Sequence, residues 1–238
     1  MNISRLVAGL LVSISGVSAQ ILGPTPYMSS ADSPFSGTIF SYFALETFES
    51  GALNTPGVQV NPEAVVIAPG TLTDSVDADD GSIDGFGTAG HSLYSANRLL
   101  KFSFTFDAAV LGALPTHAGI VWTDVGNTET GVAGIDTFTF EAFDAANISL
   151  GTTVAILGDG ISNGQTGEDR FFGAVSAEGI SRITLRAASS RDWEVDHLQF
   201  GRAAASPVPE PSTFAWGFVA LAGLCVWNRR RKTGLCRT

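Results

Sequence analysis

Acidic side chains are densest between Asp74 and Gly85, where the chain reads Asp-Ser-Val-Asp-Ala-Asp-Asp-Gly-Ser-Ile-Asp-Gly. Five carboxylates within eleven residues repel one another unless a cation neutralises them, and calcium, a hard cation with oxygen ligands, would do so. The spacing is not that of an EF-hand loop, because Gly81 comes one position early and no Glu closes the frame. The segment is therefore either a solvated acidic loop or a calcium site with the candidate ligands Asp77, Asp79, Asp80 and Asp84.

A further carboxylate, Asp196, lies in an apolar context near the end of the chain's folded part. If residues 193–200 form a strand, alternation places Asp196 on the same face as Leu198 and Phe200. A carboxylate on an apolar face needs a cation, an arginine or several N–H donors. Two partners are therefore open for Asp196, a bound cation or an ion pair with an arginine, either Arg182 or Arg186.

Signatures of catalysis are weak. The three histidines His91, His117 and His197 fit no metal-ligand spacing, and the chain has neither a Gly-x-Ser-x-Gly elbow nor a phosphate-binding loop. Paired carboxylates could serve a glycosidase, but so acidic a chain offers many such pairs. Residues 168–170, Glu-Asp-Arg, are interpreted as a turn with a local ion pair. The sequence therefore predicts a protein that is not an enzyme.

The apolar pattern predicts strands throughout the folded part. Residues 100–106 alternate strictly, with Leu100 and three phenylalanines on one face, and residues 136–144 repeat this period of two. Gly-rich turns separate many such short segments, which is typical of an all-β sandwich or jelly roll. We expect this domain to cover residues 20–202. Trp122 and Trp193 are either core residues or exposed platforms for sugar rings. The other expected strands are 39–45, 64–67, 119–122, 153–157, 170–175, 180–186 and 193–200.

Charge and cysteine content restrict the partners of this domain. Residues 20–205 carry 22 Asp and Glu against 7 Lys and Arg, a net charge of −15, whereas the whole chain has −10. This balance argues against binding nucleic acid or an anionic membrane surface, and it is compatible with divalent cations or neutral glycans. Both cysteines, Cys225 and Cys236, lie beyond the domain, so a hydrophobic core rather than disulfides must stabilise it.

The position of Glu49 near the start of the predicted domain, together with Asp196 on its last strand, resembles the carbohydrate-binding-module type of jelly roll. In that fold type, acidic residues of the first and last strands hold a structural calcium that joins the two termini. The resemblance implies that Glu49 and Asp196 are calcium ligands and that a polysaccharide is a candidate partner.

The N-terminal residues have the organisation of a secretory signal peptide. Arg5 precedes an apolar run over residues 6–17, and Val17-Ser18-Ala19 offers small side chains for cleavage. We therefore expect residues 1–19 to be removed after Ala19 and the chain to be exported.

The C-terminal residues combine a polar hinge, a short apolar run and a basic cluster. The run over residues 213–228 is expected to form a single transmembrane helix, which at about 1.5 Å per residue is short for a bilayer. The basic residues after it are expected to stay on the cytoplasmic side. In order, the parts are a linker at 203–208, Pro209-Glu210-Pro211, the helix, Arg229-Arg230-Arg231-Lys232, and a cytoplasmic tail at 233–238.

The order of parts over residues 209–232 closely resembles the PEP-CTERM sorting signal, the substrate tag of exosortases. In that family the signal retains the protein at the membrane until a cysteine-type transpeptidase recognises the Pro-Glu-Pro element and processes it. The resemblance implies an exosortase partner, transient anchoring in the inner membrane, and delivery to the cell surface or extracellular matrix.

Together these patterns predict an exported β-sandwich with a structural, adhesive or glycan-binding role. The alternative is a secreted carbohydrate-active enzyme, either a glycoside hydrolase or a lyase. A deep cleft with two carboxylates at glycosidase separation would favour the enzyme, and a shallow platform would favour binding.

Overall fold

The alternating phenylalanines form strands with one buried and one open face, as the sequence predicts. In β6 (Lys101–Phe106), Phe102, Phe104 and Phe106 are buried while the side chains between them are more exposed. The same alternation runs along β8 (Asp136–Phe143). The computed structural model describes residues 19–96, 99–128 and 131–205. The predicted signal peptide up to Ser18 and the sorting segment at 209–232 lie outside the described residues.

Two antiparallel sheets share the described strands. The first contains β1 (Gln20–Pro26), β2 (Phe40–Glu46), β4 (Val65–Ile67), β5 (Ser92–Tyr94), β7 (His117–Val125), β10 (Arg170–Val175) and β12 (Trp193–Ala203). The second contains β3 (Val58–Gln59), β6, β8, β9 (Ser149–Leu157) and β11 (Arg182–Ala187). Their strand orders are β1-β10-β7-β12-β5-β4, with β2 also paired to β12, and β3-β6-β11-β8-β9.

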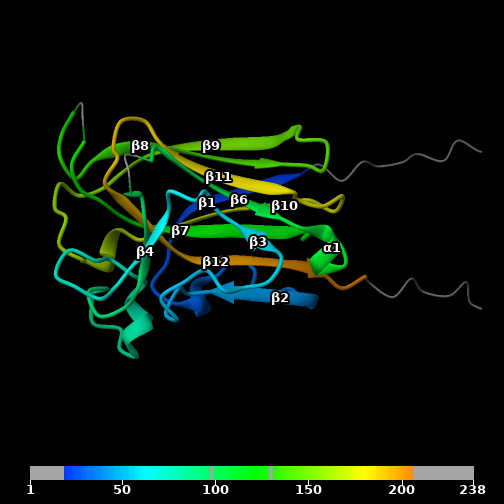
Figure 1. The fold of residues 1–238 in the computed structure, drawn as a ribbon, viewed down its shortest axis with the longest axis horizontal. Coiled ribbons are helices and arrows are strands. Elements are labelled where there is room, and N and C mark those ends of the chain that lie inside the picture. The colour runs from blue at the N-terminus through cyan, green and yellow to red at the C-terminus, as the bar shows by residue number, and fades with distance from the viewer. Residues whose placement is uncertain (1–18, 97–98, 129–130, 206–238) are drawn as a thin grey trace, which may run out of the picture. The chain divides into compact units, whose positions relative to one another are not determined.

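From β5 onward the chain crosses repeatedly between the sheets, because β6 and β8 belong to one and β5, β7 and β10 to the other. Such crossing is typical of jelly rolls, so the predicted β-sandwich is confirmed. The helices whose bounds the structure describes are all short, namely η1 (Ser30–Asp32), η2 (Asp77–Asp80), α1 (Ala108–Leu111) and η4 (Thr166–Glu168). Figure 1 shows η2 and the long loops gathered at one end of the sandwich, with α1 at the opposite end.

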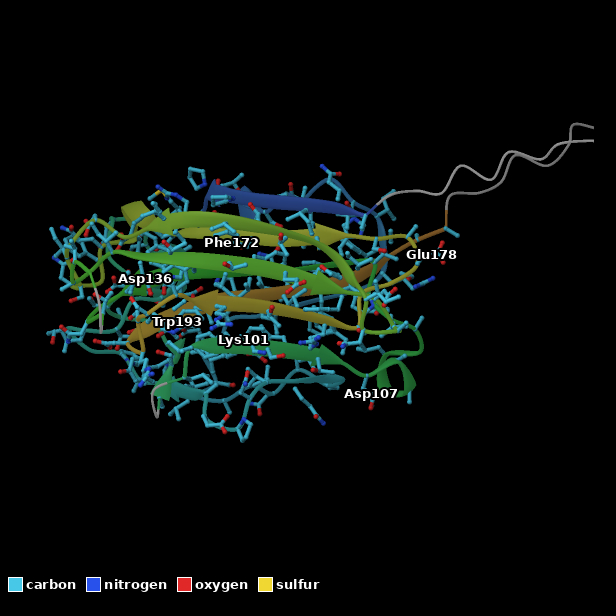
Figure 2. The ribbon with its side chains drawn as sticks, turned by 90° about the horizontal axis from the view of Figure 1, so that it is seen from above. Lys101, Asp107, Asp136, Phe172, Glu178 and Trp193 are labelled. Atoms are coloured by element: carbon cyan, nitrogen blue, oxygen red, sulfur yellow. The ribbon has the colours of Figure 1, made fainter. Side chains whose placement is uncertain are left out.

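The main core lies between the sheets and is rich in aromatic side chains. Trp193 and Phe172, both labelled in Figure 2, are fully buried. The Trp193 ring lies 4.4 Å from that of Phe102 and 5.2 Å from that of Phe138, between centroids. Trp122 is also fully buried. Both tryptophans are therefore core residues, and the idea that they form an exposed sugar platform is wrong.

A bulge interrupts β12. Its register against β7 shifts between Asp196 and Gln199, and His197 within this stretch has a φ of 44°. An inserted residue of this kind changes the phase of the side chains that follow it.

The bulge places Asp196 on the face opposite to the one expected. Asp196 pairs with Val121, which belongs to a smaller apolar cluster outside the main core. Leu198 and Phe200 belong to the main core between the sheets. The prediction that Asp196 shares their face is therefore wrong, because it assumed uninterrupted alternation.

Among the residues described, no helix is long and apolar enough to cross a membrane. The transmembrane helix predicted near 213–228 lies outside them.

The central position of Trp193 predicts a large loss of stability on truncation. Trp193→Ala should lower the free energy of unfolding by about 3 to 5 kcal/mol, because it removes buried area and leaves a cavity. Urea unfolding followed by circular dichroism measures the change. The control Val154→Ala alters a side chain that is 60% exposed and should cost less than about 0.5 kcal/mol. Equal losses in the two variants would contradict the core assignment.

Candidate metal centre and surface groove

Backbone N–H groups within the acidic segment donate hydrogen bonds to several of its carboxylates and so compensate part of their negative charge. The buried Asp77 carboxylate accepts hydrogen bonds from the N–H groups of Asp84 at 3.0 Å and Gly85 at 3.1 Å. These bonds close the loop that runs from Asp77 to Gly85. Asp80 accepts from Ser82 and Asp84 accepts from Phe86, and both carboxylates are exposed. Three of the four candidate calcium ligands in this segment therefore have a local role.

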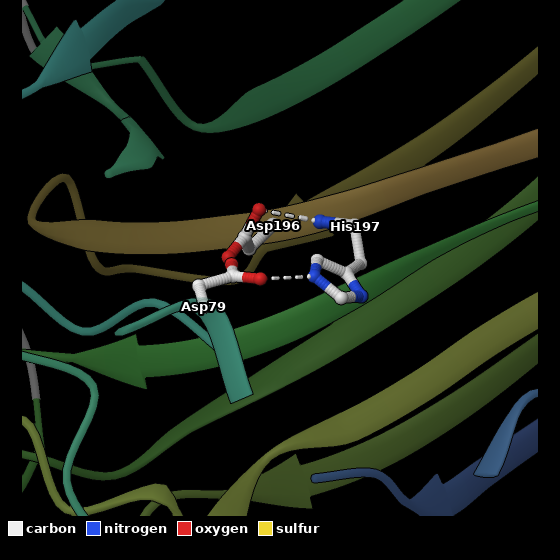
Figure 3. Close-up of side chains that lie close together, drawn as sticks. All are labelled: Asp79, Asp196 and His197. Carbon is white, nitrogen blue, oxygen red and sulfur yellow. Dashed lines mark hydrogen bonds and ion pairs between the residues drawn. The ribbon is translucent and has the colours of Figure 1, made fainter. Parts of the chain in front are cut away.

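The fourth, Asp79, reaches the bulge of β12 and meets Asp196 and His197 there (Figure 3). One possible ligand atom from each of the three lies within 4.8 Å of the others. Asp196 accepts from the N–H groups of Val76 at 2.9 Å and His197 at 2.6 Å. Burial, and next the charge of Asp79, raise the pKa of Asp196 well above its usual range.

Both ring nitrogens of His197 already have partners. Gln199 Nε2 donates to the Tyr27 hydroxyl at 2.8 Å, which leaves the tyrosine proton to donate to His197 Nδ1 at 2.9 Å. His197 Nε2 then donates to Asp79 Oδ1 at 2.8 Å. A histidine in this state has no free lone pair for a cation. The group is therefore better explained as a hydrogen-bonded network that fixes the N-terminal segment and η2 to β12.

Glu49, the remaining predicted ligand, lies outside this group. Its carboxylate accepts from the His91 N–H at 2.6 Å and contacts His91 Nδ1 at 3.2 Å near the surface. Of the six predicted calcium ligands, the structure thus brings together only Asp79 and Asp196. The alternative ion pair of Asp196 with Arg182 or Arg186 is wrong, because both arginines lie on β11 in the other sheet.

Sequence reasoning missed a set of carboxylates inside the protein. Glu194 is nearly buried and accepts from Ser92 Oγ and from the Asp74 N–H at 2.9 Å. Burial raises the pKa of Glu194 to about 8. Asp74, Asp124 and Asp169 are also buried. They come from distant parts of the chain, so no spacing motif connects them, and only tertiary structure reveals the set.

The open face of the second sheet carries a groove of about 480 Å³. The guanidinium carbon of Arg182 lies 3.8 Å from the centre of the Phe143 ring. Three of the seven basic residues of this acidic domain, Lys101, Arg182 and Arg186, line the groove. Register places side chains in three transverse rows across β6, β11 and β8, namely Lys101–Arg186–Thr139, Ser103–Thr184–Glu141 and Thr105–Arg182–Phe143.

No protein-family model and no curated protein matches the chain. Among solved structures, it is similar to the K1 cleaved adhesin domain of Lys-gingipain from Porphyromonas gingivalis. The identity is 12%, 69% of this chain and 100% of that chain are covered, and the TM-score is 0.41. It is also similar to the CBM22-1–GH10 modules of xylanase 10B from Clostridium thermocellum, solved with xylohexaose. Here the identity is 12%, 69% of this chain and 29% of that chain are covered, and the TM-score is 0.35. Similarity at this level does not bear on function.

The network around Tyr27 makes a testable contribution to stability. Tyr27→Phe removes the hydroxyl that joins Gln199 to His197 and leaves buried polar groups unpaired, which should cost about 1 to 3 kcal/mol of unfolding free energy. Urea unfolding again provides the measurement. The matched control is Tyr42→Phe, whose hydroxyl donates to the Ala113 carbonyl in a partly buried place and should cost less. A smaller loss for Tyr27→Phe than for Tyr42→Phe would refute the network.

Proposed function

We propose that this chain is an exported surface or extracellular-matrix protein whose β-sandwich binds polysaccharide without catalysis, through the groove on its second sheet. The observation that carries the proposal is the arrangement of the three transverse rows. They present hydroxyl, cationic and aromatic groups side by side across three strands, a width of about 10 Å. Such an open row suits an extended polymer better than a small molecule, which a protein usually encloses.

The chemistry of the groove favours a polysaccharide with acidic groups. Lys101, Arg182 and Arg186 outnumber Glu141, the one carboxylate among the residues that line the groove. The rest of the domain is strongly acidic, so this concentration of basic side chains is local. Arginine pairs well with carboxylates and with planar faces. The Arg182 guanidinium covers one face of the Phe143 ring and also donates to Asn147 Oδ1, so a sugar would meet this stacked pair rather than a bare aromatic face.

The support for the proposed route to the cell surface is the sequence of the C-terminal segment. The Pro209-Glu210-Pro211 element, the apolar run near 213–228 and the cluster Arg229-Arg230-Arg231 have the order of an exosortase signal. An exosortase is accordingly the proposed processing partner, and the inner membrane is the proposed transient anchor.

The alternative, a carbohydrate-active enzyme, is favoured by one observation. Burial raises the pKa of Asp124 to about 6 and that of Glu168 to about 9, and the charge of Asp124 raises the pKa of Glu168 further. A glycosidase needs two such groups in one cleft. Here Glu168 lines a depression beside Asp159, whereas Asp124 lines another beside Asp192. Because these two groups line different depressions among the described residues, we rank binding above catalysis.

Glycan-array binding of the purified full chain, followed by titration of the best acidic polysaccharide, tests the groove. Arg186→Ala and Phe143→Ala should each weaken binding about 10- to 100-fold, because each removes about 1 to 3 kcal/mol of charge-assisted or aromatic contact. The charge-matched control Arg202→Ala lies on β12 in the other sheet and should bind as the wild type does.

Two results would count against the groove. One is equal affinity for wild type, Arg186→Ala and Phe143→Ala. The other is depolymerised glycan in the same samples, which would favour the enzyme instead.

Processing of the C-terminal signal is tested separately. Mass spectrometry of surface material from the native host should show that the segment after Pro209-Glu210-Pro211 has been removed, because an exosortase would process it there. An intact C-terminus in that material would reject exosortase processing and leave the groove proposal untouched.

A further inference from the structure

The open face of the second sheet changes in chemical character toward its β9 edge. The part formed by β6 and β11 carries Lys101, Arg182 and Arg186, which line the groove. Toward β9 the face becomes apolar, because Thr139 on β8, another groove residue, pairs with Val154 on β9. Figure 1 shows these strands in one layer, and their order in the sheet is β6-β11-β8-β9. The groove is therefore followed by an apolar strip.

Two exposed aliphatic side chains of β9 form this apolar strip. Val154 is 60% exposed and Ile156 is 75% exposed. Both face the same side as the groove, because they pair with Thr139 and Thr137 on β8. Ala155, between them, points the other way and packs against the core. The strip is therefore part of the open face and not of the interior.

The apolar strip lies within reach of the groove's cations. Thr139 pairs with Arg186 on one side and with Val154 on the other. Neighbouring strands are about 4.8 Å apart, so the backbone positions of Arg186 and Val154 are about 10 Å apart. A ligand that extends across three strands therefore meets a guanidinium and the apolar strip together.

Two cations of the groove have no partner within the protein. The side chains of Lys101 and Arg186 are exposed and make no hydrogen bond or ion pair with any residue that the structure describes. Arg170, outside the groove, instead donates to two backbone carbonyls, so the local ion pair expected at 168–170 is replaced by backbone hydrogen bonds. Unpaired cations side by side in so acidic a domain point to an anionic ligand.

A pair of exposed aliphatic side chains is unusual on the described strands. β9 exposes two on one face, whereas β2 and β4 expose one large apolar side chain each, Phe43 and Val65. Strand propensity alone does not explain the pair, because threonine also favours strands and occupies the next outward position of β9, Thr152. Neighbouring exposed aliphatic groups beside a polar groove indicate a contact surface for a ligand.

The aromatic ring on this face is already partly covered. The guanidinium carbon of Arg182 lies 3.8 Å from the centre of the Phe143 ring, so one face of that ring is occupied. A ligand with both anionic and apolar groups would therefore find its apolar contact on β9.

We propose that the groove recognises acidic polysaccharides that carry ester-linked acyl groups such as O-acetyl. Lys101 and Arg186 pair with the carboxylates of the polymer, and Val154 and Ile156 contact the methyl ends of its acyl groups. This inference rests on the proposed function and names the class of polysaccharide. It also adds β9 to the binding surface.

Two physical effects favour the acylated polymer. Burial of an acyl methyl group against Val154 and Ile156 removes apolar surface from water. A free sugar hydroxyl at the same place would lose its hydrogen bonds to water and find no partner on these two side chains. The strip therefore selects against an unmodified polymer as well as for an acylated one.

Alginate, before and after chemical acetylation of its hydroxyls, tests the inference, because both polymers carry the same carboxylates. Isothermal titration calorimetry on the full chain should show that acetylated alginate binds about 4- to 15-fold more tightly, the ratio expected from burying one or two methyl groups. Both titrations use the same ionic strength, because charge contacts depend on it.

Substitutions separate the two parts of the surface. Val154→Ser and Ile156→Ser should lose the preference for the acetylated polymer and keep the wild-type affinity for unmodified alginate. Arg186→Ala should weaken binding of both polymers by the same factor. The control Val110→Ser changes a side chain that is 59% exposed on α1 and should bind both polymers as the wild type does.

Three results would overturn the inference. Equal affinity of the wild type for the two polymers overturns it and leaves the groove proposal intact. Binding of neither polymer overturns it together with the groove proposal. A wild-type dimer that Val154→Ser converts to a monomer in sedimentation velocity would identify the strip as an interface between two copies of the chain instead.

Discussion

Every side chain of β12 from Trp193 to Phe200 is buried, so this one strand must satisfy neighbours on both of its faces. One face adds Trp193, Leu198 and Phe200 to the apolar core. The other carries Asp196, whose carboxylate would be costly without N–H donors. The bulge at His197 makes both arrangements possible. It supplies a backbone N–H to the Asp196 carboxylate, and it places the side chains that follow, Leu198 and Phe200, back on the core face. The packing of the N-terminal segment and of η2 depends on this local change.

Strong alternation made part of the fold predictable. β6 and β8 were found because phenylalanines recur at every second position, a pattern that only a strand buries on one face. β5 was missed because three residues are too few for a period. β1 was missed because Gly23 and Pro24 in its interior are typical of turns. The phase of β12 was misread, because alternation was counted from Leu198 and Phe200 alone, whereas the apolar residues change phase between Val195 and Leu198, where the bulge lies.

The residues of the candidate sites, like the strands, could be predicted from the sequence only in part. The sequence made Asp79 and Asp196 candidate ligands of two separate calcium sites, and the structure brings the two residues together, with His197 rather than with Glu49. Asp169 could not be found, because it lies beside Arg170 and such a pair is normally a solvated turn. Whether a carboxylate faces solvent or protein depends on chain segments that are distant in sequence. The residues next to it in the sequence therefore cannot predict its burial.

Charge is separated within the sandwich. Carboxylates gather among the loops and inside the protein, while Lys101, Arg182 and Arg186 stand on the open face of the second sheet. This separation explains how a domain with a net charge of −15 can present a locally basic surface. Net charge alone is therefore a poor guide to the ligands of such a domain.

The place where β12 ends has a mechanical consequence. The strand pairs with β7 on one side and with β2 on the other, and it ends at Ala203, next to the segment that leads to the predicted anchor. Tension applied from that side would pull along β12 and load its hydrogen bonds to both neighbours in shear. Several bonds would then have to break together rather than one at a time. A domain tethered through a central strand can resist pulling, whereas one tethered through an edge strand can be peeled apart.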